Sequence, residues 1–127
     1  MIHLDTSFLI RSLVRQTPED RALRSWIKAG TPLAMSAVGW AELLCGPLEE
    51  HHFALVRRIL AEIVPFDAEA AALAAQLFNR TGRRRGTLAD CMIAATAMRA
   101  DAPLASSNPA DFARFVADGL QVAGVPE

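Results

Sequence analysis

The chain has 127 residues, a formal net charge of −1 and 52% hydrophobic residues. That length suits one domain with a substantial core, over residues 1–127, and the apolar content argues against intrinsic disorder. The charge excludes a broad basic field for nucleic acid and leaves only a local patch, for which Arg80, Arg83, Arg84 and Arg85 are the candidates.

No apolar run reaches membrane-spanning length. Asp5 also interrupts the first apolar stretch, where a signal peptide would be continuous. Two cysteines, Cys45 and Cys91, are too few for a disulfide framework, and both lie in helical apolar patterns. We therefore expect a cytoplasmic protein without membrane contact and with two buried thiols.

Short strand-like segments alternate with longer segments of helical periodicity. Helix starts are marked by N-cap residues, and Gly30 and Gly82 mark helix ends. This alternation predicts an α/β fold, a three-layer αβα sandwich around a mainly parallel sheet. The expected strands are residues 2–4, 33–35, 63–66, 103–105 and 120–122, and the expected N-caps are Thr17, Ser36, Asp67, Thr87 and Asn108.

Three acids stand in predominantly apolar surroundings: Asp5 after the first strand, Glu42 in a helix, and Asp90 near the start of another helix. Buried carboxylates need compensation for their lost hydration. Ligands of open α/β sheets bind outside the carboxyl ends of the strands, where these acids could meet. A bound divalent cation would then relieve their repulsion.

Each acid also has a local interpretation. Asp5 is a suitable N-cap for a helix beginning near Ser7, and Thr87 to Asp90 matches a capping box. For Glu42 the local interpretation is a solvent-exposed position, but Trp40, Leu43 and Leu44 favour a mostly buried helix. Glu42 is too deep in this helix to cap it and has no basic neighbour at helical spacing. Its neighbours there include Gly39 and Gly46, which would let backbone or ligand come close to the carboxylate.

The segment containing Asn108 and Asp111 follows the fourth expected strand and either begins a helix or completes the acidic site. Thr6 and Ser7 supply hydroxyls beside Asp5. No Cys/His cluster has zinc-ligand spacing, whereas oxygen ligands favour Mg²⁺ or Mn²⁺. Such ions activate water and stabilise leaving oxygens, which points to hydrolysis of phosphate esters.

These motifs, in this order, resemble the PIN-domain ribonucleases, especially the VapC-type toxins of toxin–antitoxin pairs. The similarity extends from Met1 to about Phe115. It rests on residues 2–7, on residues 36–46 around Glu42, on residues 88–97 around Asp90, and on residues 106–112.

The resemblance implies an endoribonuclease that uses Mg²⁺ or Mn²⁺. Asp5, Glu42 and Asp90 would be metal ligands, Asn108 would complete the catalytic set, and Thr6, Ser7 and Asp111 would support it. It also implies a homodimer and a small antitoxin whose tail covers the acidic pocket. The run of Arg83, Arg84 and Arg85 is either an RNA contact or an exposed loop.

Two alternatives remain open. A haloacid-dehalogenase-like phosphatase also begins with a strand ending in Asp, but it needs a second acid where Ser7 stands and a downstream Lys, and Lys28 is the sole lysine. A PIN-like module that has lost activity and only binds RNA or protein would keep the fold without the chemistry.

Overall fold

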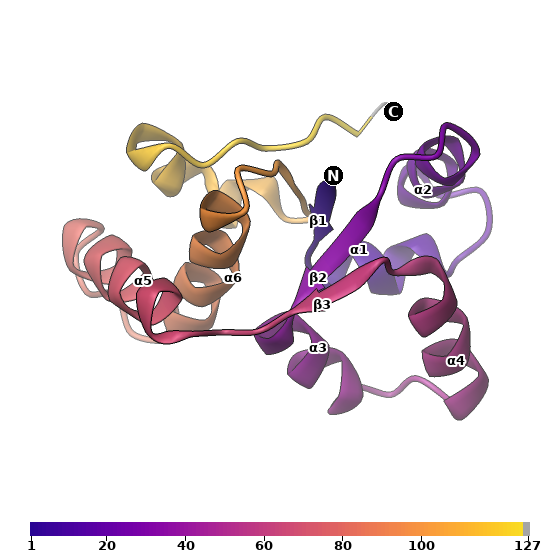
Figure 1. Cartoon of the computed structure of the whole chain (residues 1–127), viewed down its shortest axis with the longest axis horizontal. Coiled ribbons are helices and arrows are strands. Elements are labelled where there is room, and N and C mark those ends of the chain that lie inside the picture. Colours follow the sequence, from indigo (N-terminus) through magenta and orange to yellow (C-terminus); the bar gives the residue numbers. More distant parts are fainter. Residues whose placement is uncertain (126–127) are drawn as a thin grey trace.

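The computed structural model describes residues 1–125 and consists of a four-stranded parallel sheet between two groups of helices (Figure 1). The strand order is β3-β2-β1-β4, and every neighbouring pair is parallel. This confirms the predicted α/β sandwich. The elements are β1 (Ile2–Leu4), α1 (Thr6–Ser12), α2 (Pro18–Lys28), β2 (Leu33–Ser36), α3 (Ala37–Leu44), α4 (Glu50–Ile59), β3 (Glu62–Val64), α5 (Ala68–Arg80), α6 (Leu88–Arg99) and β4 (Leu104–Ala105), followed by the short 3₁₀ helices η1 (Pro109–Asp111) and η2 (Ala113–Asp118).

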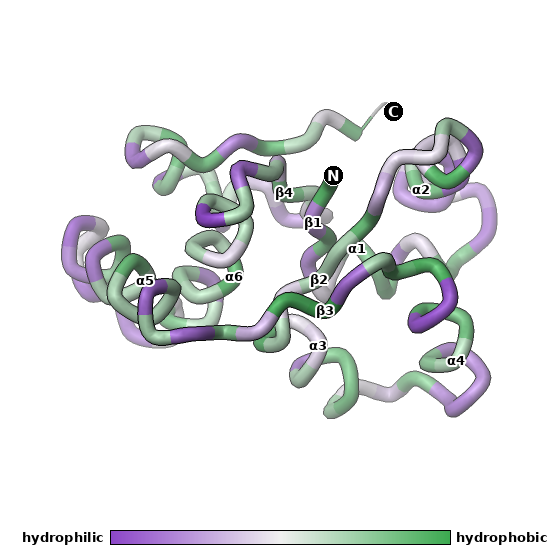
Figure 2. Tube along the Cα trace, viewed as in Figure 1, coloured by the Kyte–Doolittle hydropathy of each residue, from purple (hydrophilic) through white to green (hydrophobic). Residues whose placement is uncertain are grey.

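Two cores lie on opposite faces of the sheet because side chains alternate along the strands. In β4, Leu104 belongs to the core beneath α5 and α6, and Ala105 belongs to the core beneath α1, α2, α3 and α4. Helix α6 lies between α5 and the sheet, and most of its length is pale to green in the hydropathy view (Figure 2). Its small side chains, such as Ala94 and Ala97, are fully buried and permit close packing.

Most predicted helix starts are confirmed in detail. The side chains of Thr17, Ser36 and Asp67 each accept a hydrogen bond from a backbone N–H in the first turn of their helix. Gly30 and Gly82 adopt positive φ just after α2 and α5, the backbone conformation that a glycine tolerates at a helix end.

Several local predictions are wrong. Thr87 does not cap α6, because its hydroxyl donates to the Arg84 carbonyl instead, 2.7 Å away. Asn108 provides no side-chain cap and precedes only a 3₁₀ turn. The expected fifth strand is reduced to one parallel bridge between Leu104 and Val122. Cys91 is buried as predicted, but Cys45 is exposed because α3 ends at Leu44 on the surface.

The strand expected at residues 63–66 corresponds to β3, which begins one residue earlier, at Glu62, and ends two residues earlier, at Val64. Within residues 1–125, no helix is both long enough and apolar enough to cross a bilayer.

Candidate acidic site at the carboxyl end of the sheet

Asp5 lies at the junction of β1 and α1, and 4% of its surface is exposed. Its Oδ1 accepts hydrogen bonds from the Phe8 backbone N–H at 2.8 Å and from the Ser7 hydroxyl at 2.9 Å. Ser106, which follows β4, contributes a further side-chain hydrogen bond to this carboxylate. The predicted N-cap role is confirmed, and the capping interaction holds the Asp5 carboxylate at the carboxyl end of the central strand.

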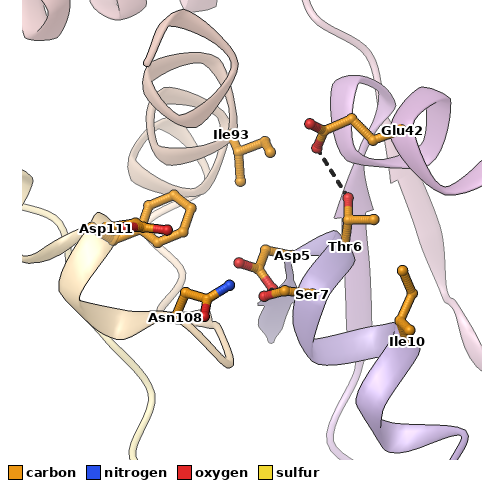
Figure 3. A pocket seen from close by; sticks show the side chains of 9 residues that line it. Asp5, Thr6, Ser7, Ile10, Glu42, Ile93, Asn108 and Asp111 are labelled. Carbon is orange, nitrogen blue, oxygen red and sulfur yellow. Dashed lines mark hydrogen bonds between the residues drawn. The ribbon is translucent and has the colours of Figure 1, made fainter. Parts of the chain in front are cut away.

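Glu42 projects from α3 toward the start of α1. Its Oε1 lies 3.1 Å from the Thr6 hydroxyl, which is also 3.0 Å from the Gly39 carbonyl oxygen (Figure 3). Gly39 has no spare room, since a Cβ there would lie 3.3 Å from the Ser36 hydroxyl. Glu42 is exposed, so its expected apolar burial is wrong: α3 is only half-buried, and its outer face carries Leu44, 50% exposed.

These side chains share one cavity of about 270 Å³. Figure 3 shows carboxylate, amide and hydroxyl groups entering it from α1, α3 and the segment after β4. The sequence separates Asp5 from Asp111 by more than a hundred positions, yet both reach this cavity. Its walls are formed by Asp5, Thr6, Ser7, Ile10, Glu42, Ile93, Asn108, Asp111 and Phe112.

Asp90 lies at the edge of this cavity, in the first turn of α6 and one turn before Ile93. Burial raises the pKa of Asp90, and the negative charge of Asp111 raises it further. The negative charges of Glu42 and Asp5 also raise the pKa of Asp90, by smaller amounts. The four carboxylates therefore belong to one electrostatic neighbourhood, although Asp90 does not itself line the cavity.

The site carries more negative charge than its surroundings compensate. Burial also raises the pKa of Asp5, and the charge of Asp111 adds to this, even though hydrogen bonds from Ser106, Phe8 and Ser7 act in the opposite direction. Among residues 1–125, the cation paired with Asp90 is Arg114, whose Nη2 lies 3.7 Å from the Asp90 Oδ2, too far for a hydrogen bond.

The donor set fits a hard divalent cation, because carboxylate, amide and hydroxyl oxygens are its preferred ligands. Within the part of the chain that the structure describes, no three His, Cys, Asp or Glu side chains are already arranged to hold a metal ion. The carboxylates around the cavity would therefore need to move closer together to share an ion.

The predicted site residues thus fall into two groups. Asp5, Thr6, Ser7, Glu42, Asn108 and Asp111 lie together, with Asp90 beside them. The predicted RNA-binding residues Arg83, Arg84 and Arg85 lie elsewhere, exposed in the loop between α5 and α6. Arg83 adopts a positive φ, and its Nε donates to the Asn79 side chain at 3.1 Å.

Three residues of this region are absent from the predicted set: Ser106, Arg114 and Glu19. Arg114 stacks on the Phe115 ring at 4.5 Å, and its Nε and Nη2 are buried without a hydrogen-bond partner among the described residues. Ser106 is the only one with a sequence signal, since it directly follows the fourth strand. The other two reach the region through tertiary packing.

The fold and the pocket define an α/β protein with an oxygen-lined acidic site at the carboxyl ends of its parallel strands. The PIN domain family model matches residues 2–117, so the chain belongs to the PIN domain family. The predicted resemblance is confirmed, and this assignment does not support the phosphatase alternative. No curated relative matches the chain.

Solved structures that match almost the whole chain include members of toxin–antitoxin systems. A toxin–antitoxin complex from Klebsiella pneumoniae is 25% identical, with TM-score 0.74, covering 100% of this chain and 99% of that one. FitAcB from Neisseria gonorrhoeae is 27% identical, with TM-score 0.66 and coverages of 98% and 97%. VapBC-5 from Mycobacterium tuberculosis is 29% identical, with TM-score 0.56 and coverages of 94% and 91%.

Proposed function

We propose that this chain is a Mg²⁺- or Mn²⁺-dependent endoribonuclease and the toxin of a toxin–antitoxin pair. The observation that carries the proposal is the convergence of Asp5, Glu42 and Asp111 on one cavity, with Asp90 coupled to them by charge. Membership of the PIN domain family supports a nuclease, and the matched toxin–antitoxin complexes support the toxin role.

Asp5, Glu42 and Asp90 would hold the metal, with Asn108 completing the catalytic set. When bound, a divalent cation supplies a Lewis acid and a means of generating a hydroxide nucleophile at neutral pH. Asp5 is fixed by three hydrogen bonds, so its carboxylate is already oriented before any ligand arrives. Thr6 orients Glu42 in the same way, and Asp111 supplies additional negative charge from η1.

The chain's own groups also suit a phosphodiester. The amide of Asn108 provides donors at the cavity rim, where phosphate oxygens would lie, whereas the hydroxyl protons of Thr6 and Ser7 are already used within the protein. The four acids would repel a phosphate unless a cation neutralised them, which makes substrate binding dependent on metal. Arg83, Arg84 and Arg85 remain candidate contacts for the RNA backbone away from the cavity.

The proposed partners are an RNA substrate, a cognate antitoxin and a second copy of this chain. The antitoxin would cover the acidic cavity and inhibit it. An inactive PIN-like module that only binds RNA or protein is the alternative outcome of the activity test.

An RNA-cleavage assay tests the proposal. The purified chain, freed of any antitoxin, is incubated with a mixed RNA pool in Mg²⁺, in Mn²⁺ and in EDTA, beside the Asp90→Asn variant. Cleavage that requires metal and is lost in the variant is expected. Binding of RNA without cleavage in either metal would leave the inactive-module alternative, and equal cleavage by Asp90→Asn would contradict the assignment.

A further inference from the structure

Two buried carboxylates of α2, Glu19 and Asp20, lie outside the acidic cavity and have no part in the chemistry above. Glu19, in the first turn of α2, is 8% exposed. A carboxylate in a first helical turn is stabilised by the helix dipole while exposed, so its burial needs another reason. The partners of Glu19 supply one, because they come from two other parts of the fold.

Both partners bind the same carboxylate oxygen. The Arg11 Nε, from α1, donates to the Glu19 Oε2 at 2.9 Å, and the Ser107 hydroxyl, from the segment after β4, donates to it at 2.6 Å. Burial alone would raise the pKa of Glu19, but hydrogen bonds from Ser107, from the Glu19 backbone and from Arg11, together with the positive charge of Arg11, outweigh burial and lower that pKa. Glu19 is therefore an ionised anchor that joins α1, α2 and the segment after β4.

The anchored segment is continuous with the acidic cavity. The Ser107 backbone N–H donates to the Ser7 hydroxyl at 3.3 Å, and that hydroxyl donates to the Asp5 Oδ1 at 2.9 Å. The Asn108 N–H donates to the Ser106 hydroxyl at 2.9 Å, and Ser106 in turn bonds to Asp5. Residues 106–108 thus connect Glu19 directly to the buried acid of the site.

The segment after β4 is held at its two ends by Ala105 and Phe112, which are packed in the cores, and few side chains between them are buried. Asn108 and Asp111 are exposed, and η1 spans only three residues without a side-chain cap. A second hollow, of about 660 Å³, shares Ser7, Ile10 and Asn108 with the acidic cavity and also has Glu19 and Ser107 in its wall. Residues 106–108 therefore line a hollow next to the acidic cavity and depend on Glu19 for one of their few buried contacts.

We infer that Glu19 is a positioning residue: it holds residues 106–108 against α1, so that Asn108 and Asp111 face Asp5 across the acidic cavity. Glu19 does not line that cavity and touches no reacting atom. The inference deepens the proposed function. Its test by RNA cleavage rests on that function.

The next residue provides a matched control. Asp20 is also 8% exposed and also pairs with an arginine, since its Oδ1 accepts from the Arg24 Nε at 2.8 Å. Its Oδ2 accepts from the Gln16 N–H at 2.9 Å, so its partners all lie in or just before α2. Asp20→Asn removes a comparable buried ion pair from the same helix without affecting residues 106–108.

The test compares Glu19→Ala, Glu19→Gln, Ser107→Ala and Asp20→Asn in the full chain. Glu19→Ala is expected to lower kcat by roughly 10- to 100-fold, the cost of misplacing a reacting group by about 1 Å, while KM for RNA changes less than about twofold. Glu19→Gln keeps an acceptor for Ser107 and should recover part of kcat. Asp20→Asn should retain wild-type kcat, and a double Glu19→Ala/Ser107→Ala variant should be no worse than the poorer single variant.

A second readout is independent of catalysis. Amide hydrogen exchange at residues 107–111 should be faster in Glu19→Ala and Ser107→Ala than in Asp20→Asn, because these amides lose their anchor.

If the wild-type chain cleaves no RNA, the proposed function fails, but the exchange comparison still tests the anchor. Equal exchange in all variants, or equal loss of kcat in Asp20→Asn and Glu19→Ala, would overturn the inference. Ser107→Ala leaves α2 intact and decides the matter if Glu19→Ala does not fold.

Discussion

Asp5 combines an observed role with a proposed one. Its carboxylate caps α1 and also lies in the acidic cavity, so a local stabilising interaction and a proposed metal-ligand position coincide. The Oδ1 atom receives the capping hydrogen bonds, whereas burial and the charge of Asp111 oppose ionisation of the group as a whole. The cap thus holds a carboxylate in a place where its charge is unfavourable without a cation.

Asp5→Asn should therefore stabilise the metal-free protein at pH 7 by on the order of 1 kcal/mol, because the amide keeps an acceptor for the Phe8 N–H and carries no charge. The folded-state pKa of Asp5 is raised, so the wild type regains this stability as pH falls through that pKa, and the advantage of the variant should shrink in acid. Urea unfolding at pH 7 and pH 4 measures it. A variant less stable than the wild type at pH 7 would show that the charge is already compensated.

His3 is another buried titratable group. It lies in the central strand β1, is 1% exposed, and neither ring nitrogen has a hydrogen-bond partner among the described residues. Burial lowers the pKa of His3, and the N-terminal ammonium lowers it further. Protonation on the folded protein is therefore disfavoured relative to the unfolded chain.

Because this pKa is lowered, His3 contributes full stability above about pH 6.5, and that stability is lost as pH falls toward the folded pKa. The loss should approach about 1.4 kcal/mol per pH unit within that window. His3→Leu should remove this part of the pH dependence, while the exposed-site control His51→Gln should keep it. Parallel stability curves for the wild type and His3→Leu from pH 7 to pH 5 would contradict the account.

At the scale of elements, the local signals in the sequence predict helix starts but not what each helix face meets. Thr17, Ser36 and Asp67 cap their helices as predicted because a cap depends only on the next three residues. Glu42 was expected to be buried because its neighbours are apolar, yet α3 exposes that side. Glu19 shows the reverse, since this acid in the first turn of α2 is buried by residues 8 and 88 positions away.

The loop between α5 and α6 is where the predicted RNA contact can be tested. Replacing Arg83, Arg84 and Arg85 with alanine should weaken RNA binding and reduce its salt dependence, because fewer counterions would be displaced from the phosphates. The loop is exposed, so the melting temperature should change little. Filter binding at two or more salt concentrations distinguishes the hypotheses, and an unchanged salt slope would identify the run as a solvated loop.

At the scale of the whole molecule, the fold was predictable because alternating strands and helices leave few alternatives to a parallel sandwich. The convergence of Asp5, Glu42, Asn108 and Asp111 was predictable for the same reason, since parallel strands end at one edge. The anchoring of residues 106–108 and the approach of Arg114 to Asp90 were not, because both depend on contacts between segments that no local pattern relates.

The central claim is that carboxylates distant in sequence form one site for a hard cation. Calorimetric titration of Mn²⁺ into the metal-free chain, with Asp5→Asn, Glu42→Gln and Asp90→Asn beside it and Glu69→Gln as an exposed control, tests this claim directly. Saturable binding that each of the three substitutions weakens at least tenfold, and that Glu69→Gln leaves unchanged, is the predicted result. Absence of saturable binding at millimolar Mn²⁺, or unchanged affinity in all three site variants, would contradict it.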